Sequence, residues 1–218
     1  MGYPWAKDME HVAFGMVSLT DGTLSTREGR VVFLEEVLNQ AIAKTRAVIE
    51  EKNPDLENKD TVSRDVGVGA VVFSALSSSR IKDIVFDLDR VLNFDGETGP
   101  YVQYTHARAR SLLRRAQGQF EVDCDYSALS GPQAFSVLRS LGAFPETIRK
   151  AADKNEPSLI TRHVIDLAQA FNRFYYDVRV IDEEQPQATA ARLALAKATA
   201  EVIKTGLHLI GLNAPDRM

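Results

Sequence analysis

The chain has 218 residues, a hydrophobic content of 44% and a formal net charge of -4. This length supports one large hydrophobic core or two small ones. The acidic balance excludes nucleic-acid binding by a uniformly basic surface and leaves only recognition by a local patch. No apolar run approaches the roughly 20 residues of a membrane helix, and the N-terminus lacks a basic segment followed by an apolar one. We therefore expect a cytoplasmic protein with no membrane partner.

Cysteine and histidine residues are sparse. Cys124 is the only cysteine, which excludes an internal disulfide and a metal site built from cysteines. The four histidines lie far apart in the sequence and show no spacing typical of metal ligands. We predict no metal site.

The first residues predict a strand whose partner is not obvious. Residues 11–17, His-Val-Ala-Phe-Gly-Met-Val, read as a buried strand. Such a strand either pairs with a later segment or belongs to a sheet encoded upstream. Its unpaired edge would favour association between chains, although a monomer is expected. The polar segment 18–30 follows, and its residues alone indicate a hairpin turn.

Two amphipathic helices are predicted next. Apolar residues repeat with the helical period over residues 34–52, and Pro54 ends that helix. A second helix is predicted over residues 63–78, where Gly67 favours close packing against a neighbouring helix. Residues 80–93 combine an apolar stretch with three acids.

The segment from residue 94 to 115 begins as a turn and continues as a helix. Gly96 and Gly99 permit the turn, Thr98 or Gly99 caps the helix, and Pro100 suits the first helical position. At about 100° per residue, one arc of this helix is apolar and is predicted to pack inward. Its members are Val102, Thr105, Ala109, Leu112, Leu113 and Ala116.

A second stripe on the same helix is predicted to face solvent. It consists of Tyr101, Tyr104, Arg108, Ser111 and Arg115, which follow one another at spacings of three and four. Interleaved aromatic residues and arginines suit unstacked bases beside phosphates. The alternative is a solvated face whose arginines pair with acids of the preceding segment. Those acids are Asp83, Asp87, Asp89 and Asp95.

The following segment is predicted to be a surface loop over residues 118–132. Two short helices are expected after it, over residues 133–141 and 145–155, because Gly142 and Pro145 interrupt the helical pattern.

The longest clear helix is predicted to begin at Pro157. A seam with alternating spacings of four and three is expected to face the core, and it comprises Ile160, Val164, Leu167, Phe171, Phe174 and Val178. Tyr176 lies on the opposite, solvent-facing side beside Asn172, which indicates binding or an isolated exposed aromatic residue. Tyr175 lies at the packed edge of the seam. A last helix over residues 187–210 is apolar on most sides, so it is predicted to be central and to end at Gly211.

Four segments together closely resemble the arginyl-tRNA synthetases, a branch of the class I aminoacyl-tRNA synthetases. They are Ser25-Thr26-Arg27, Gly-Pro-Tyr-Val-Gln-Tyr at 99–104, Phe-Asn-Arg-Phe-Tyr-Tyr at 171–176, and Arg-Leu-Ala-Leu at 192–195 together with Arg217-Met218. The resemblance runs from about Trp5 to Met218 and is weakest over residues 118–132. It implies the C-terminal part of such an enzyme.

This resemblance implies a mainly α fold: a helical bundle of the class I synthetase anticodon-binding (DALR) type with a short α/β remnant of the catalytic nucleotide-binding fold at the N-terminus. It also implies three parts. Residues 1–33 would be the end of the catalytic domain with its signature loop, residues 34–93 connecting helices, and residues 94–218 the anticodon-binding domain.

The resemblance further implies which residues act. Ser25 and Arg27 of the signature loop would face the phosphates of ATP and stabilise the charge that develops as pyrophosphate leaves, with Thr23 in place of the consensus lysine. Tyrosines and the final methionine would contact splayed anticodon bases, and the arginine stripe would contact phosphates. The predicted tRNA contacts are Tyr101, Tyr104, Arg108, Arg115, Asn172, Tyr176 and Met218.

The implied function is binding of tRNA(Arg) through its anticodon loop. The parent enzyme would attach arginine to that tRNA with ATP and Mg²⁺, whereas this chain would need no cofactor of its own. The sequence contains no His-x-Gly-His motif and no strands for an arginine pocket. We therefore expect it to be inactive by itself and to require a missing N-terminal catalytic portion. The alternative is a free-standing helical protein-interaction module derived from that domain, without ligase activity.

Overall fold

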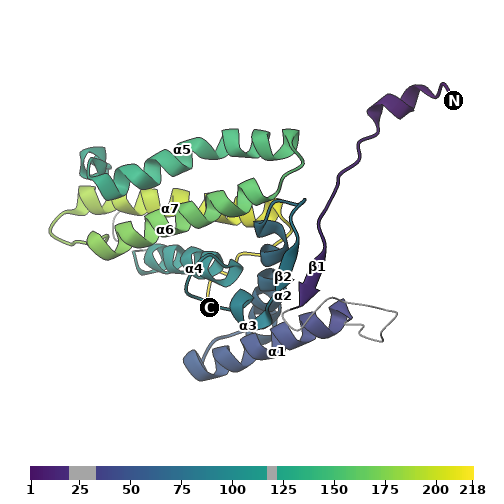
Figure 1. Ribbon diagram of the computed structural model, residues 1–218. Coiled ribbons are helices and arrows are strands. Elements are labelled where there is room, and N and C mark those ends of the chain that lie inside the picture. The colour runs from purple at the N-terminus through teal and green to yellow at the C-terminus, as the bar shows by residue number, and fades with distance from the viewer. Residues whose placement is uncertain (20–32, 117–121) are drawn as a thin grey trace.

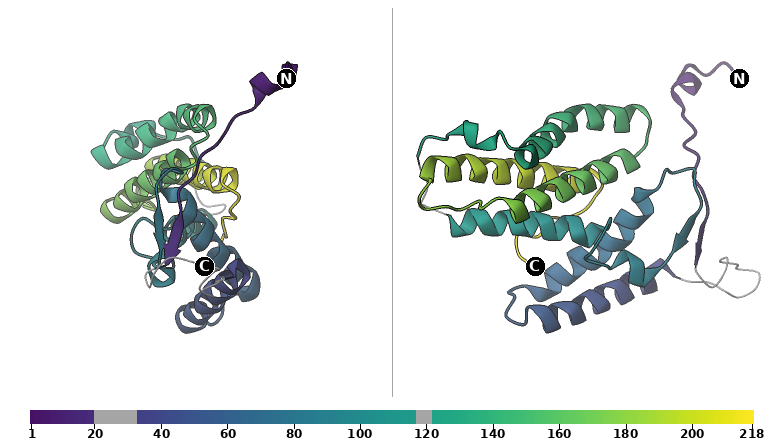
Figure 2. Two further views of the ribbon diagram at one scale, coloured as in Figure 1. Left: turned by 45° about the vertical axis from the view of Figure 1, so that its right-hand side comes forward. Right: turned by 60° about the vertical axis from the view of Figure 1, so that its left-hand side comes forward.

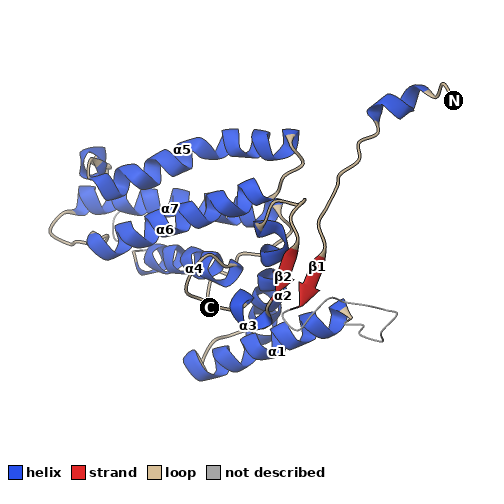
Figure 3. Ribbon diagram, in the orientation of Figure 1, coloured by secondary structure: helices blue, strands red, loops and turns tan. Residues whose placement is uncertain are grey.

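The computed structural model describes residues 1–19, 33–116 and 122–218, and these parts are mainly helical (Figures 1 and 3). The helices are α1 (Leu34–Lys52), α2 (Lys59–Ser77), α3 (Leu88–Val91), α4 (Gly99–Arg115), α5 (Pro132–Asp153), α6 (Ser158–Asp177) and α7 (Pro186–Leu209). The other elements are the strands β1 (Val17–Leu19) and β2 (Ile84–Phe86) and the 3-10 turns η1 (Pro4–Asp8) and η3 (Tyr126–Leu129). The expectation of a mainly α fold with a small α/β portion near the N-terminus is confirmed.

Helices α4, α5, α6 and α7 form a bundle that encloses the main core (Figures 1 and 2). The predicted seam of α6 is confirmed, since five of its six members are at most 4% exposed: Ile160, Val164, Leu167, Phe171 and Phe174. Helix α7 contacts α4, α5 and α6, as its apolar pattern predicted. Helix α2 reaches this core through Phe73, which is fully buried.

Helix α7 ends where the sequence places the stop. Gly211 has a φ of 80°, in the left-handed region that favours glycine. Its N–H donates to the His208 carbonyl at 2.9 Å, and the Leu212 N–H donates to the Leu207 carbonyl at 2.9 Å. These two hydrogen bonds form a Schellman motif, which turns the chain back toward α4.

Helices α1 and α2 form an antiparallel pair beside the bundle (Figure 1). Gly67 permits their close approach, because a Cβ at this position would lie 2.8 Å from the backbone nitrogen of Ile42. Helix α2 begins at Lys59, four residues before the predicted start at Ser63. Its first turn is polar, and apolar periodicity does not mark such a turn.

The predicted buried strand over residues 11–17 is wrong. The strand β1 begins only at Val17, and the preceding segment is exposed and extends away from the helices (Figure 1), with Phe14 84% exposed. The partner of β1 is β2, which lies in the segment expected to be a connector, and the two strands are parallel with Val17 opposite Ile84. Two strands cannot enclose an apolar segment, so the residues before Val17 find no core within the described part of the chain.

The predicted pair of short helices after residue 132 is also wrong, because α5 is continuous through Gly142 and Pro145. Proline removes one backbone hydrogen bond of a helix and leaves the carbonyl four residues earlier without its partner. Here Gly142 and Pro145 both lie on the exposed side, where water can satisfy that carbonyl, while Phe144 is buried against the bundle. Packing of the buried side therefore maintains the helix.

The glycine at the α1–α2 contact yields a stability prediction. We expect Gly67→Ala to lower the free energy of unfolding by about 1–3 kcal/mol, because backbone must move to admit the methyl group. Gly142→Ala is the matched control: nothing lies within 4 Å of the added Cβ, and alanine favours the helix by about 0.5–1 kcal/mol. Urea denaturation followed by circular dichroism measures both. Equal stabilities for the two variants would contradict the close-contact role of Gly67.

Candidate nucleic-acid interface

Helix α4 has one face in the core and another at the surface, as its sequence predicts. Thr98 is the N-cap, and its Oγ1 accepts a hydrogen bond from the Tyr101 N–H at 3.3 Å. The inward arc is confirmed, and its members Val102, Thr105 and Ala109 are fully buried. The outer stripe is less exposed than predicted. Tyr101 is half-buried against the core, whereas Tyr104 is 43% exposed.

Asn172 of α6 links the stripe into one polar network. Its Nδ2 donates to the Tyr101 hydroxyl at 3.0 Å and to the Thr105 hydroxyl at 2.9 Å. Its Oδ1 accepts a hydrogen bond from the Arg108 guanidinium. Because both amide hydrogens and the oxygen are engaged within the protein, Asn172 fixes the direction of Arg108 across the α4–α6 interface.

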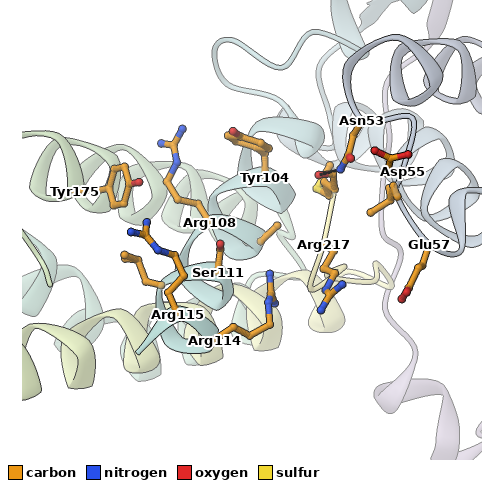
Figure 4. Close-up of a pocket in the computed structure, with 14 residues that line it drawn as sticks. Asn53, Asp55, Glu57, Tyr104, Arg108, Ser111, Arg114, Arg115, Tyr175 and Arg217 are labelled. Carbon is orange, nitrogen blue, oxygen red and sulfur yellow. Dashed lines mark hydrogen bonds between the residues drawn. The ribbon is translucent and has the colours of Figure 1, made fainter. Parts of the chain in front are cut away.

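Arg108 lies between two tyrosine rings (Figure 4). Its guanidinium carbon is 5.0 Å from the centroid of Tyr104 and 5.1 Å from that of Tyr175, within the range of cation–π attraction. Tyr175, which is 36% exposed, was not among the residues predicted to bind RNA. Its position three residues after Asn172, on the same side of α6, was the signal that could have identified it.

These side chains border a hollow of about 400 Å³. Figure 4 shows Arg108, Arg114 and Arg115 of α4 on one side of it, with Arg217 of the C-terminal tail nearby. The other side is formed by the turn between α1 and α2, which contributes Asn53, Asp55 and Glu57. The hollow is therefore cationic on the α4 side and carries carboxylates on the opposite side.

A neighbouring hollow of about 590 Å³ shares Tyr104, Arg108, Asn53 and Met218 with the first. Its remaining wall is largely apolar, with Val48, Ile49, Val62, Val66 and Phe94 among the lining residues. Such a wall suits a flat apolar group better than a phosphate.

The tail after α7 brings Met218 to this place because α4 holds its backbone. The buried Gln103 Nε2 donates to the Asn213 carbonyl at 2.8 Å, and the buried His106 Nδ1 lies 3.0 Å from the Pro215 carbonyl. At the tip of α1, Asn53 Nδ2 donates to the Met218 carbonyl at 3.1 Å. The Met218 side chain then packs on the small apolar cluster between α1 and α2.

Two of the four arginines of α4 pair with the tail and not with the acids named by the alternative. Arg110 Nε lies 3.1 Å from Asp216 Oδ1, and Arg114 donates to the Asp216 carbonyl at 3.0 Å. Within the described residues, no ion pair joins these arginines to Asp83, Asp87, Asp89 or Asp95. Asp83 and Asp87 instead accept hydrogen bonds from backbone amides, and Asp89 pairs with Lys44.

The structure therefore gathers most of the predicted tRNA contacts: Tyr101, Tyr104, Arg108, Arg115, Asn172 and Met218 all line these two hollows. Tyr176 is 90% exposed, as predicted, and lies outside both hollows. Ser25 and Arg27 lie outside the described residues. Within residues 1–19, 33–116 and 122–218, no cluster of side chains has the arrangement of a metal site, and no helix has the length and hydropathy needed to span a membrane.

The tail contact yields a pH prediction. Burial lowers the pKa of His106 from its ordinary value of 6.5, against the opposing effect of the hydrogen bond to Pro215. Below pH 6.5 the unfolded chain therefore binds a proton that the folded chain resists, and stability falls with falling pH. We expect the urea midpoint to drop between pH 7.5 and 5.5, and His106→Gln to reduce this drop. The pKa of His163, also lowered by burial, accounts for a remaining slope. An unchanged pH dependence in His106→Gln would contradict this assignment.

Similarity to known proteins agrees with this geometry. Residues 102–218 match the family described as the DALR anticodon binding domain, and residues 1–88 match the tRNA synthetases class I (R), catalytic domain. Arginine–tRNA ligases from Halothermothrix orenii and Clostridioides difficile are each 54% identical over the whole chain, which covers 38% of their length. A solved Thermus thermophilus arginyl-tRNA synthetase has a TM-score of 0.86 and 34% identity, over 100% of this chain and 37% of that one. None of these matches supports the alternative of a protein-interaction module. The chain therefore belongs to the arginyl-tRNA synthetase family and carries its DALR anticodon-binding domain.

Proposed function

We propose that this chain binds tRNA(Arg) by holding unstacked anticodon-loop bases across the outer stripe of α4. The observation that carries the proposal is the stack of Tyr104, Arg108 and Tyr175 beside a hollow with a cationic wall, on a domain of an anticodon-binding family. Single-stranded RNA is bound by aromatic platforms next to cations, because every base offers a π-face and every linkage a negative charge.

The two hollows suit different parts of a nucleotide, namely its base and its phosphate. Tyr104 and Met218 border both, and the apolar wall of the larger hollow suits the flat surface of a base. Arg108 and Arg115 supply positive charge on the α4 side for phosphates. Asp55 and Glu57 lie opposite, where a carboxylate repels phosphate but accepts a hydrogen bond from the amino group of a base. This arrangement fixes which side of a nucleotide faces α4.

Asn172 acts on the RNA through its neighbours. Its amide hydrogens are used by Tyr101 and Thr105, and its oxygen is used by Arg108. We assign it the role of a positioning residue, and we assign Tyr101 a packing role at the floor of the larger hollow. Tyr176, which is 90% exposed, is available to a base outside the hollows.

The proposal extends to the whole enzyme. The chain spans 38% of the length of the relatives it matches, so arginine attachment with ATP and Mg²⁺ would require a catalytic portion that these relatives contain. Residues 1–33 would contribute the signature loop with Ser25 and Arg27, residues 34–93 the connecting helices, and residues 94–218 the anticodon-binding domain. We place the protein in the cytoplasm as a monomer whose binding partner is tRNA(Arg).

The first test is a titration of the chain, at fixed salt, with tRNA(Arg), an anticodon-swapped variant of it and a non-cognate tRNA. Preference for the native anticodon is expected. Tyr104→Ala and Tyr176→Ala should each weaken binding by about 5- to 140-fold, the range for loss of one base–aromatic stack. The control is Tyr126→Ala, which removes a 66% exposed tyrosine that lines neither hollow. Equal binding to all three tRNAs would refute anticodon recognition by this chain.

A second test addresses Asn172. We expect Asn172→Ala to weaken tRNA(Arg) binding, and to have no further effect when Arg108 is already replaced by alanine, because the asparagine acts through that guanidinium. A double-mutant cycle measures this coupling. Effects that add in full would instead assign Asn172 its own contact with RNA. Circular dichroism of each variant checks that the α4–α6 interface is retained.

A further inference from the structure

A third hollow, of about 440 Å³, lies at the end of α6. It shares Leu112, Arg115 and Tyr175 with the first hollow, so the two are adjacent and these side chains form a common wall. Arg108 lies over Tyr175 and lines the first hollow but not the third. The third hollow therefore lies on the other side of Tyr175 from Arg108. Its outer wall is the loop between α6 and α7, which contributes Arg179, Ile181 and Glu183.

Hydrogen bonds from α7 hold the loop between α6 and α7 in place. Thr189, fully buried on α7, accepts a hydrogen bond from the Asp182 N–H at 2.9 Å and donates to the Asp182 carbonyl at 2.9 Å. Arg192 of the same helix donates to the Arg179 carbonyl at 2.9 Å. Val180 is buried between these two points. The wall of the third hollow is thus built before any ligand arrives, which lowers the entropic cost of binding.

The charge of this hollow favours an anion. Arg115 and Arg179 face it with one acid, Glu183. Arg179 is 74% exposed at its side chain, and its nearest carboxylate oxygen, in Asp182, is 3.8 Å away, at the outer limit of an ion pair. Such a pair contributes little in solvent, so the guanidinium is free to exchange it for a phosphate.

We propose that the third hollow binds one further nucleotide of the same RNA strand, with its phosphate on Arg179 and Arg115 and its sugar and base against Val178, Ile181 and Tyr175. This inference rests on the proposed function, because the strand enters from the first hollow. The wall shared with the first hollow and the two arginines that line the third identify the occupant. The strand would thus cross α4 and leave the domain along the loop between α6 and α7.

Substitutions at two exposed residues of the loop are expected to change RNA affinity in opposite directions. The probe is an anticodon stem-loop RNA of the cognate tRNA, bound to the full chain over a range of salt concentrations. Arg179→Gln should weaken binding and reduce the slope of log affinity against log salt by about 0.7, the value for one phosphate contact of a single strand. Glu183→Gln should strengthen binding, because it removes the only acid lining this hollow within the described residues. Arg149→Gln on α5 is the control and should leave the slope unchanged, since Arg149 lines none of the three hollows.

Replacing the phosphates of the probe one at a time with neutral methylphosphonates locates the contact. In the wild-type chain, one replacement should weaken binding at least as much as Arg179→Gln does, and the same replacement should have a smaller effect in Arg179→Gln, where only Arg115 still faces that phosphate. An unchanged salt slope in Arg179→Gln, or methylphosphonate effects that are all undiminished in it, would overturn the third hollow alone if wild-type binding still depends on the anticodon. Loss of anticodon dependence in the wild type would overturn the proposed function and this inference together.

Discussion

The candidate interface depends on two buried polar side chains of α4. Gln103 and His106 are buried on the side of the helix that the C-terminal tail crosses, and both hold carbonyls of that tail. A buried polar group without a partner costs about 1–3 kcal/mol, so these contacts define one path for the tail. That path carries Met218 to the tip of the α1–α2 pair, where Asn53 and the small apolar cluster receive it. The tail therefore adds Arg217 and Met218 to the hollow between α4 and the α1–α2 turn.

Helices α4 and α6 each have one side in the core and one side in solvent. The helical periodicity of their sequences largely predicted this. The α6 seam alternates at four and three residues, and five of its six members are buried, so the opposite side had to face solvent. The same reasoning placed the inner arc of α4, the cap at Thr98 and the left-handed stop at Gly211. These features are local consequences of helix geometry, which the sequence specifies directly.

Features that depend on tertiary contacts were not predictable in the same way. Strand β1 pairs with β2, and Val17 lies opposite Ile84, which is sixty-seven residues later in the sequence. Strands of three residues carry no clear alternating pattern of apolar and polar residues. The continuity of α5 through Pro145 depends on Phe144 packing against other helices. Tyr101 follows the outer spacing of α4, yet Asn172 and the core draw it inward. The contact of Arg108 with the Tyr175 ring joins α4 to α6, so it too depends on tertiary packing.

The proposed RNA recognition is compatible with an acidic composition because the arginines have different partners. Asp216 engages Arg110 and Arg114 in the tail contact, so these cations mainly serve the fold. Arg108 is held by Asn172 between two tyrosines and keeps the direction that a stack requires. Arg115 and Arg179 border the hollows with only distant or absent carboxylate partners among the described residues. A few fixed cations give weaker salt dependence than a basic surface does, and they leave selectivity to the shape and polarity of the hollows. Under the proposed function, the acidic remainder of the surface would repel RNA that does not fit these hollows.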